Sequence, residues 1–421
     1  MHVVVLGLWH LGSVTAACIA RHHHVTGIDF DAAVIGGLGT GRAPLHEPGL
    51  DALLSAGIGS GNLSFSAEPA VAAAADVLWV CYDTPVNADD VSDLAWVHAR
   101  LARVLPGLRP GTVVLISSQL PVGTCVQLAK QYPLLHFACS PENLRLGKAI
   151  EAFEKPARII VGATTTHAQS ILEIMLTPLG APLLWMRPES AEMVKHALNS
   201  FLALSVAYIN EIAALAETVG ADAQEVAAGL KSDPRIGPRA YLGPGGPFAG
   251  GTLARDVVTL SQLGADQKIP LALIPAIKES NDRHRGWAFR KVSAAIAGIP
   301  QPVVAVLGLA YTPNTSTLRR SAAVELCRQL LAAKIQVQAF DPLIRAADAE
   351  HRDLPFSCSA TDVLRGAHAA VICTEWPEFR DYPWPALLAG MARPVVIDAN
   401  RLVEKAVAPA AGAVYITVGR P

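Results

Sequence analysis

Charged residues, aromatic residues and paired cysteines are all scarce in this chain. Charged residues make up 17% of the 421 positions and leave a formal net charge of −2, which gives no electrostatic reason to expect a nucleic acid or an anionic membrane as partner. Aromatic residues reach only 6%, but 51% of the residues are hydrophobic, which excludes a disordered chain. This length exceeds one ordinary core, so we expect two or three domains.

The seven cysteines lack CxxC spacing, and several stand in apolar runs, such as Cys81 in VLWVCY and Cys373 in AAVIC. This distribution predicts reduced, buried thiols in a cytoplasmic protein. The run His22-His23-His24 has no carboxylate or cysteine companion, so it is typical of a solvated turn and no metal is predicted.

No long apolar run is free of polar residues. The first six residues are typical of a strand rather than of a secretion signal. The most apolar helical stretch, about 193–219, contains Lys195, Asn199, Asn210 and Glu211, which argues against a membrane span. We therefore expect a cytoplasmic protein.

Two stretches alternate short apolar strands with helical patterns, and a helical stretch separates them. The pattern predicts an α/β fold with two Rossmann-like, doubly wound parallel-sheet domains joined by a helical central region. The expected domains are 1–187, 188–298 and 299–421, and a Gly- and Pro-rich loop at 236–251 interrupts the helical part. The expected strands are 2–6, 24–28, 77–82, 113–117, 137–139 and 159–162 in the first domain, and 303–307, 337–340, 369–373 and 394–397 in the last.

The first expected strand runs into a glycine turn that begins at Gly7 and ends at Gly12, and Asp29 ends the second strand. These are elements of the dinucleotide fingerprint, in which a helix N-terminus takes the pyrophosphate and the acid takes the ribose hydroxyls. Asp29 favours NAD over NADP, because its charge would oppose a 2′-phosphate. The second glycine of the fingerprint is Trp9 here, so a βαβ unit without cofactor stays open on these residues alone.

Further motifs follow in a fixed order over nearly the whole chain. They read GRAPLHEPGL (41–50), DTP (83–85), PVGT (121–124), SPENL (140–144), EMVKHALN (192–199), NE (210–211), DPRIG (233–237) and LGLAY (307–311). Together they resemble the UDP-glucose/GDP-mannose dehydrogenase family, of which this chain looks like a divergent member. The resemblance implies an N-terminal NAD-binding domain, a C-terminal domain for the nucleotide of a sugar, and a central helix that builds a homodimer or higher oligomer.

The resemblance also implies roles for individual residues. Lys195 and Asn199 match the family's lysine and asparagine that take the proton and hold the oxyanion during hydride transfer, and their spacing of four places them on one helix face. Asp256 matches the aspartate that handles water, and Glu142 matches the glutamate of hydrolysis. The implied cofactor residues are Gly7, Trp9, Leu11, Gly12, Asp29, Thr84, Pro85, Ser118, Arg255 and Arg319. The implied substrate residues are Asn143, Leu144, Arg235, Tyr241, Phe248, Gly250 and Tyr311.

The chain departs from the family most sharply at the nucleophile. The family's cysteine follows the glycine-rich loop, where this chain reads GGTLARD (250–256), one residue shorter and without a cysteine. Neither Thr252 nor Leu253 readily replaces a thiolate. Other departures from family residues are Gln119 for a threonine, Thr312 for a lysine, Asn400 for an arginine (with Arg401 adjoining it), and Leu146 for a glutamate.

These losses fall mainly on the second oxidation and hydrolysis, while residues for one hydride transfer are kept. The first hypothesis is an NAD-dependent oxidoreductase that acts on a nucleotide sugar of the UDP-hexose type without a cysteine thioester. Two alternatives are a full 6-dehydrogenase in which water attacks directly, and an epimerase that oxidises its substrate transiently. A third, of another class, is a non-catalytic nucleotide-sugar-binding homologue in which Trp9 fills the pyrophosphate site.

Overall fold

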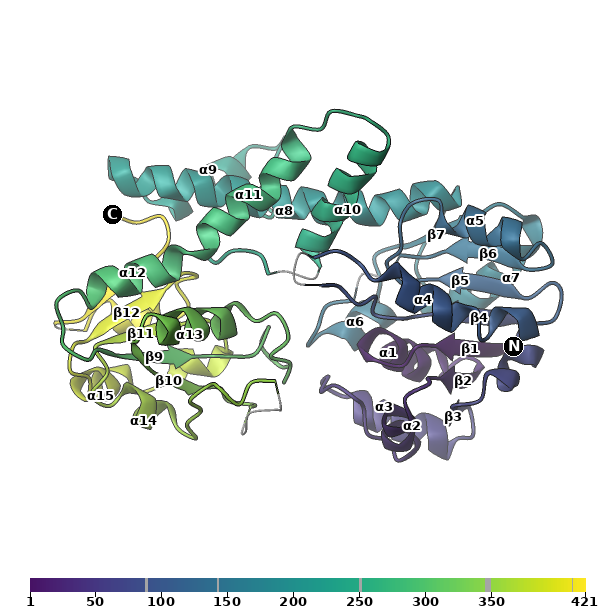
Figure 1. The fold of residues 1–421 in the computed structure, drawn as a ribbon, viewed down its shortest axis with the longest axis horizontal. Helices are drawn as coiled ribbons and strands as arrows, with labels where there is room; N and C mark the ends of the chain where they lie inside the picture. Colours follow the sequence, from purple (N-terminus) through teal and green to yellow (C-terminus); the bar gives the residue numbers. More distant parts are fainter. Residues whose placement is uncertain (88–89, 142–143, 250–251, 345–349, 411) are drawn as a thin grey trace. The chain divides into compact units, whose positions relative to one another are not determined.

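The computed structural model describes residues 1–87, 90–141, 144–249, 252–344, 350–410 and 412–421 (Figure 1). The chain forms two compact units, Met1–Leu198 and Asn199–Pro421. The boundary between them falls inside the longest helix, α8 (Pro188–Val219, 32 residues). The two Rossmann-like sheet domains and the helical region predicted from the pattern are therefore confirmed, although α8 is shared between the units.

The first unit is built on an eight-stranded sheet in the order β3-β2-β1-β4-β5-β6-β7-β8. Its strands are β1 (His2–Leu6), β2 (His24–Ile28), β3 (Leu63–Ser66), β4 (Val77–Val80), β5 (Val113–Ile116), β6 (His136–Cys139), β7 (Ile159–Ala163) and β8 (Leu183–Met186). Its helices are α1 (His10–Ile19), α2 (Ala32–Gly39), α3 (Leu50–Gly59), α4 (Leu94–Leu101), α5 (Thr124–Gln131), α6 (Ala149–Glu154) and α7 (Thr166–Leu176).

Each face of this sheet has its own hydrophobic core. On β1, Val3 and Val5 pack in one cluster, whereas Val4 and Leu6 pack in the other. This alternation follows from the two-residue period of a strand, and burial on both faces explains why the strand is apolar throughout.

Two features of the first sheet differ from the prediction. Strands β6 and β7 pair antiparallel, with Cys139 opposite Gly162, so the sheet is mixed rather than wholly parallel. Strands β3 and β8 were not predicted. Both have half-exposed or exposed residues, so they lack the continuous apolar run by which the inner strands were found.

The second unit contains the rest of α8, eight further described helices and a five-stranded sheet in the order β10-β9-β11-β12-β13, in which all pairs are parallel. The strands are β9 (Val303–Leu307), β10 (Gln336–Phe340), β11 (Ala369–Ile372), β12 (Val395–Asp398) and β13 (Val414–Ile416), of which β13 was not predicted. The helices are α9 (Ala223–Ser232), α10 (Leu253–Asp266), α11 (Leu273–Arg285), α12 (Trp287–Ala295), α13 (Ala322–Ala332), α14 (Ala360–Leu364), α15 (Trp384–Ala389) and α16 (Glu404–Val407).

Helix α8 is long and apolar enough to cross a membrane by length and composition alone, a test that buried core helices also pass. Half of its most apolar window is buried inside the protein. Its buried polar residues include Glu192, Lys195, Asn199 and Asn210. These groups have partners within the fold, which is the expected arrangement for a core helix.

The cysteines and the histidine run can now be placed. All seven thiols are free, but Cys358 is exposed and Cys373 is half-buried, so the prediction of buried thiols was wrong for these two. His22 and His24 are exposed, and the Nε2 atom of His23 lies 3.0 Å from the carbonyl oxygen of Met175.

Candidate active site

The glycine turn after β1 has the tight geometry that its two remaining glycines allow. Gly7 has a φ of +91°, and a Cβ atom there would lie 2.4 Å from the Tyr82 ring. A Cβ atom on Gly12 would lie 1.6 Å from the carbonyl oxygen of Gly7, so helix α1 approaches the turn too closely for any side chain. Both glycines are therefore required for this approach.

Trp9 occupies the N-cap position of α1, and 43% of it is exposed. Its bulk projects toward solvent instead of into the core, and its carbonyl oxygen accepts hydrogen bonds from the backbone N–H and hydroxyl of Ser13. The indole therefore leaves the tight turn between Gly7 and Gly12 intact.

Two carboxylates contact the same turn. Asp29 follows β2, as predicted, and accepts a 2.7 Å hydrogen bond from the backbone N–H of Leu8. Asp83 accepts a 3.3 Å hydrogen bond from the backbone N–H of Leu11, in the first turn of α1. The positive end of the helix dipole thus already attracts an anionic group in this chain.

This turn fits a dinucleotide cofactor. A helix N-terminus that directs N–H groups at an anion, a glycine-permitted close approach and a strand-terminal acid are all present. Gly7, Gly12 and Leu11 would hold the pyrophosphate through backbone, and Asp29 the ribose.

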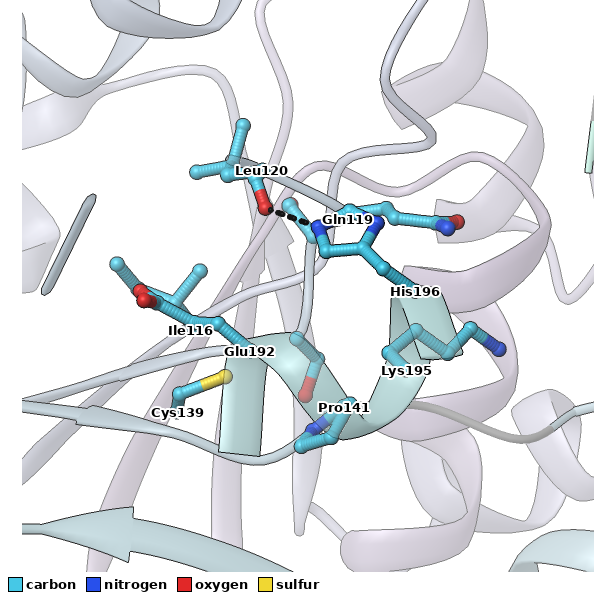
Figure 2. A pocket seen from close by; sticks show the side chains of 10 residues that line it. Ile116, Gln119, Leu120, Cys139, Pro141, Glu192, Lys195 and His196 are labelled. Carbon is cyan, nitrogen blue, oxygen red and sulfur yellow. Dashed lines mark hydrogen bonds between the residues drawn. The ribbon is translucent and has the colours of Figure 1, made fainter. Parts of the chain in front are cut away.

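A small cavity in the first unit brings together residues from β5, β6 and α8 (Figure 2). It is lined by Ile116, Ser117, Ser118, Gln119, Leu120, Cys139, Pro141, Glu192, Lys195 and His196. Of the predicted residues, Lys195 and Ser118 meet here, and both are buried. Thr84 is buried as well, and its hydroxyl donates a 2.9 Å hydrogen bond to the carbonyl oxygen of Gln119, so the segment with Thr84 and Pro85 supports the cavity wall.

Glu192 and His196 attach the loop after β5 to helix α8, and the sequence reasoning missed both. The Glu192 carboxylate accepts hydrogen bonds from the backbone N–H groups of Gly123 and Cys125, at the start of α5. Burial raises the pKa of Glu192, and these backbone donors oppose that rise. The Nε2 atom of His196 lies 3.1 Å from the carbonyl oxygen of Leu120 (Figure 2).

Lys195 lies between these two attachment points on α8, so the two contacts hold the loop after β5 and the helix segment that carries Lys195 together as parts of one cavity lining. The signal was present in the sequence, because Glu192 stands three residues before Lys195 and therefore on the same helix face.

In the second unit, Asn199 and Asp256 form a buried pair. The Asn199 amide nitrogen donates to the Asp256 carboxylate, and Asp256 is completely inaccessible to solvent. Asp256 lies in the first turn of α10, where its charge is favourable to the helix dipole. The contact fixes the orientation of the Asn199 amide on α8, so these two predicted residues do come together.

The segment that replaces the family's nucleophile is occupied by side chains with other contacts. Leu253 begins α10 and packs with the hydrophobic cluster that contains Ala203 and Phe248. Thr252 is the exposed N-cap residue, and its side chain is hydrogen-bonded to the hydroxyl of Tyr311. Burial raises the pKa of Tyr311 against that hydrogen bond, so both groups stay neutral at physiological pH.

Several predicted residues do not reach a buried site within their unit. Tyr241 and Arg319 are exposed, and the exposed Arg235 side chain pairs with Asp233 through two hydrogen bonds of 3.0 and 2.7 Å. Arg255 is half-buried on α10, and Leu144 packs against the core of the first unit. Glu142, Asn143 and Gly250 lie outside the described residues.

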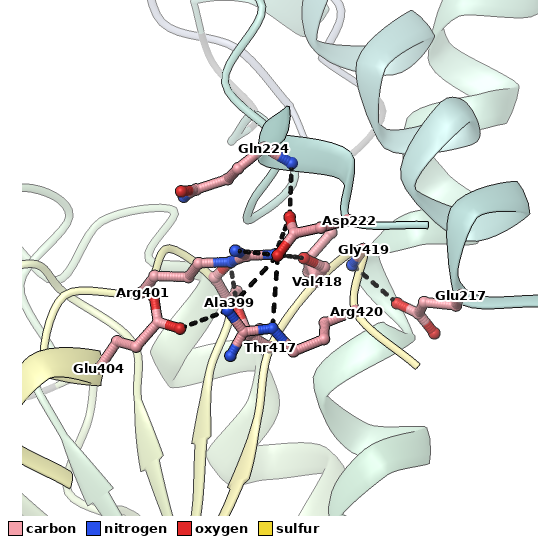
Figure 3. A network of polar contacts seen from close by, with 10 residues as sticks. All are labelled: Glu217, Asp222, Gln224, Ala399, Arg401, Glu404, Thr417, Val418, Gly419 and Arg420. Carbon is pink, nitrogen blue, oxygen red and sulfur yellow. Dashed lines mark hydrogen bonds and ion pairs between the residues drawn. The ribbon is translucent and has the colours of Figure 1, made fainter. Parts of the chain in front are cut away.

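Arg401, which adjoins the position where Asn400 replaces an arginine of the family, is paired with an acidic residue of its own unit. Its guanidinium is buried and bonds both oxygens of Asp222 at 2.8 and 2.7 Å (Figure 3). Arg420 also contacts Asp222 and Glu404, and the backbone N–H of Gly419 donates to Glu217. Arg401 therefore helps to attach the C-terminal segment to the α8–α9 junction.

Three consecutive family descriptions match the chain. They are the UDP-glucose/GDP-mannose dehydrogenase family's NAD binding domain over residues 1–179, its central domain over 189–283 and its UDP binding domain over 305–405. The chain belongs to the UDP-glucose/GDP-mannose dehydrogenase family. It is accordingly an NAD-dependent nucleotide-sugar oxidoreductase, and the resemblance predicted from its motifs is confirmed.

Named relatives agree in length and fold. The chain is 34% identical to a UDP-glucose 6-dehydrogenase of Rhizobium meliloti, and each chain is covered completely. It is 31% identical to UDP-glucose 6-dehydrogenase TuaD of Bacillus subtilis, over all of this chain and 93% of that one. A UDP-glucose dehydrogenase structure from Pyrobaculum islandicum has a TM-score of 0.88 at 29% identity and covers all of this chain and 98% of its own.

Proposed function

We propose that this protein oxidises the hexose of a UDP-linked sugar by hydride transfer to NAD, without a cysteine thioester. The observation that carries this proposal is the retention of the Lys195 cavity and the buried Asn199–Asp256 pair beside the loss of the nucleophile. NAD, when bound, supplies the acceptor for the hydride.

Lys195 and Asn199 have separate roles in the proposed hydride transfer. The C6 hydroxyl of the sugar loses its proton to Lys195, while its carbon loses a hydride, and the products are an aldehyde, NADH and a proton. Asn199 donates a hydrogen bond to the oxygen on which negative charge develops. Asp256 keeps the Asn199 amide nitrogen directed, because it accepts one of its protons inside a site that excludes water.

The start of α10 supports a reaction that stops at two electrons. An enzyme-bound thioester needs a thiolate near the sugar, but Leu253 is packed in a hydrophobic cluster and Thr252 is an unactivated alcohol bonded to Tyr311. Cys139 lines the Lys195 cavity, yet it is 5% exposed and lies in the apolar cluster that also contains Cys125.

A full four-electron oxidation is the second candidate, favoured by the names of the relatives. It would proceed through the aldehyde hydrate, with Asp256 assisting the water. Epimerisation through transient oxidation and nucleotide-sugar binding without turnover are further alternatives.

The stoichiometry of the reaction distinguishes these candidates. The purified protein is incubated with NAD and a panel of UDP- and GDP-sugars, and both NADH absorbance and product mass are followed. One NADH per sugar and a mass loss of two hydrogens support the proposal. Two NADH per sugar contradict it, and unchanged mass without net NADH indicates epimerisation. A Cys139→Ser variant then tests the thiol that lines the Lys195 cavity: if this substitution abolishes a second oxidation, the thioester route is present at Cys139.

A further inference from the structure

The segment Gly245 to Phe248 has no regular secondary structure, yet side chains satisfy its backbone polar groups. Asn210 accepts from the N–H of Gly245 at 3.0 Å and donates to the carbonyl of Gly246 at 3.3 Å. Asn281 bonds both the N–H and the carbonyl of Phe248, at 3.0 and 2.9 Å. The loop is therefore held in one conformation by donors and acceptors from α8 and α11.

His284 and Asn400 complete this set. The Nε2 atom of His284 donates to the carbonyl oxygen of Gly245 at 2.7 Å, and the Oδ1 atom of Asn400 accepts from the N–H of Gly246 at 2.8 Å. Of the four holding side chains, Asn400 alone comes from the C-terminal sheet, where it follows β12.

Asn400 fits the loop closely. A Cβ atom on Gly245 would lie 2.1 Å from the Oδ1 atom of Asn400, so this approach requires glycine at position 245. The backbone of Asn400 is fixed as well, because its N–H donates to the Asp398 carboxylate at 3.2 Å. The side chain is thus part of a rigid connection from the end of β12 to the loop.

The contact between Asn400 and the loop joins the end of β12 to the segment that precedes α10. Ligands of open parallel sheets bind at the carboxyl ends of the strands, which is where Asn400 stands, and the matched UDP binding domain includes this position. The loop, in contrast, leads directly to α10, which carries Asp256.

We propose that Asn400 is a positioning residue for the sugar: it holds the glycine-rich loop against the nucleotide-binding edge, so that the nucleotide and its sugar meet a loop that is already in one conformation. The inference rests on the proposed nucleotide-sugar substrate, but not on the number of oxidation steps. It assigns Asn400 a contact with the loop, at a position where the resemblance implies an arginine.

The test compares binding of UDP with binding of UDP-glucose by calorimetry in three variants of the full chain. Asn400→Leu keeps the approximate size of the side chain and removes the oxygen that accepts from Gly246, whereas Asn400→Asp keeps an accepting oxygen. Gln329→Leu, which removes an exposed amide from α13, is the matched control. We expect Asn400→Leu to bind UDP within twofold of the wild type and UDP-glucose at least tenfold more weakly, with Asn400→Asp recovering most of the loss.

Thermal unfolding of the same variants separates positioning from folding. A midpoint for Asn400→Leu close to that of the wild type, together with the selective loss for UDP-glucose, supports the proposal. Equal losses for both ligands, or unchanged binding of UDP-glucose, overturn it. Binding and thermal unfolding do not depend on turnover. A failure of the two-electron proposal would appear in the NADH stoichiometry instead, so the two failures can be distinguished.

Discussion

Replacing Asp222 with asparagine tests the polar network that attaches the C-terminal segment to the α8–α9 junction. Asp222 is the N-cap of α9, and its side chain also accepts from the N–H of Gln224. Asparagine is an equally good N-cap, so Asp222→Asn preserves the helix start and removes only the charge that faces Arg401 and Arg420. The expected loss of stability is therefore electrostatic.

The magnitude follows from the pKa of Asp222, which the hydrogen bonds from Arg401 lower from 3.8 to about 2. At about 1.4 kcal/mol per pKa unit, this shift corresponds to roughly 2 kcal/mol of stability. The Arg401 side chain is only 5% exposed, so the variant also leaves a buried guanidinium with weaker partners. We expect a total loss of about 2–4 kcal/mol at pH 7.

The sign of the pH dependence is fixed, because the folded-state pKa lies below the unfolded one. The stabilisation is complete above about pH 4 and is lost as the pH falls toward the folded-state pKa of about 2. The stability difference between the wild type and Asp222→Asn should therefore shrink as the pH is lowered from 4 toward 2.

Urea unfolding followed by circular dichroism at pH 7, and thermal unfolding between pH 2.5 and 7, would measure the difference. Asp233→Asn is the matched control, because Asp233 forms an exposed pair with Arg235 and should not change the midpoint. Equal shifts in the two variants, or a difference for Asp222→Asn that stays constant with pH, would refute the reasoning.

Three further predictions concern the first unit. Asp83→Asn should tighten NAD binding about tenfold in calorimetry, because it removes an anion that contacts Leu11 at the pyrophosphate end of α1; unchanged affinity at low salt would contradict this. Glu192→Gln should destabilise the fold by about 1–3 kcal/mol in urea unfolding and reduce kcat, since one of two backbone N–H groups loses its acceptor; wild-type values for both would show that the contact is dispensable. Gly12→Ala should abolish NAD binding measured by fluorescence titration, because the added Cβ meets a backbone oxygen at 1.6 Å, whereas Gly39→Ala, with no atom within 4 Å of the added Cβ, should bind normally.

The sequence predicted the inner strands well, because each is a short apolar run buried on both faces, as β1 is. It could not predict that β6 and β7 run antiparallel, since strand direction depends on the path of the intervening chain and not on the composition of either strand. The short edge strands β3 and β8 lacked the apolar signal altogether.

The candidate site also contains residues that local patterns could indicate and contacts that they could not. Lys195, Asn199 and Asp256 were proposed from motifs, and the residues that contact them could not be predicted in the same way. The pairing of Arg401 with Asp222 spans 179 positions, and the bond from Asn400 to Gly246 spans 154, so no local pattern could reveal either. Glu192 was within reach, because helical spacing alone places it beside Lys195.

Helix α8 sets the distance along its axis between Lys195 and Asn199. The boundary between the compact units falls after Leu198, so Lys195 belongs to one unit and Asn199 to the other. The rise of an α-helix nevertheless fixes the axial separation of these residues at about 6 Å. The separation of the two side chains along the axis is therefore a property of one continuous helix, and it needs no other element to maintain it.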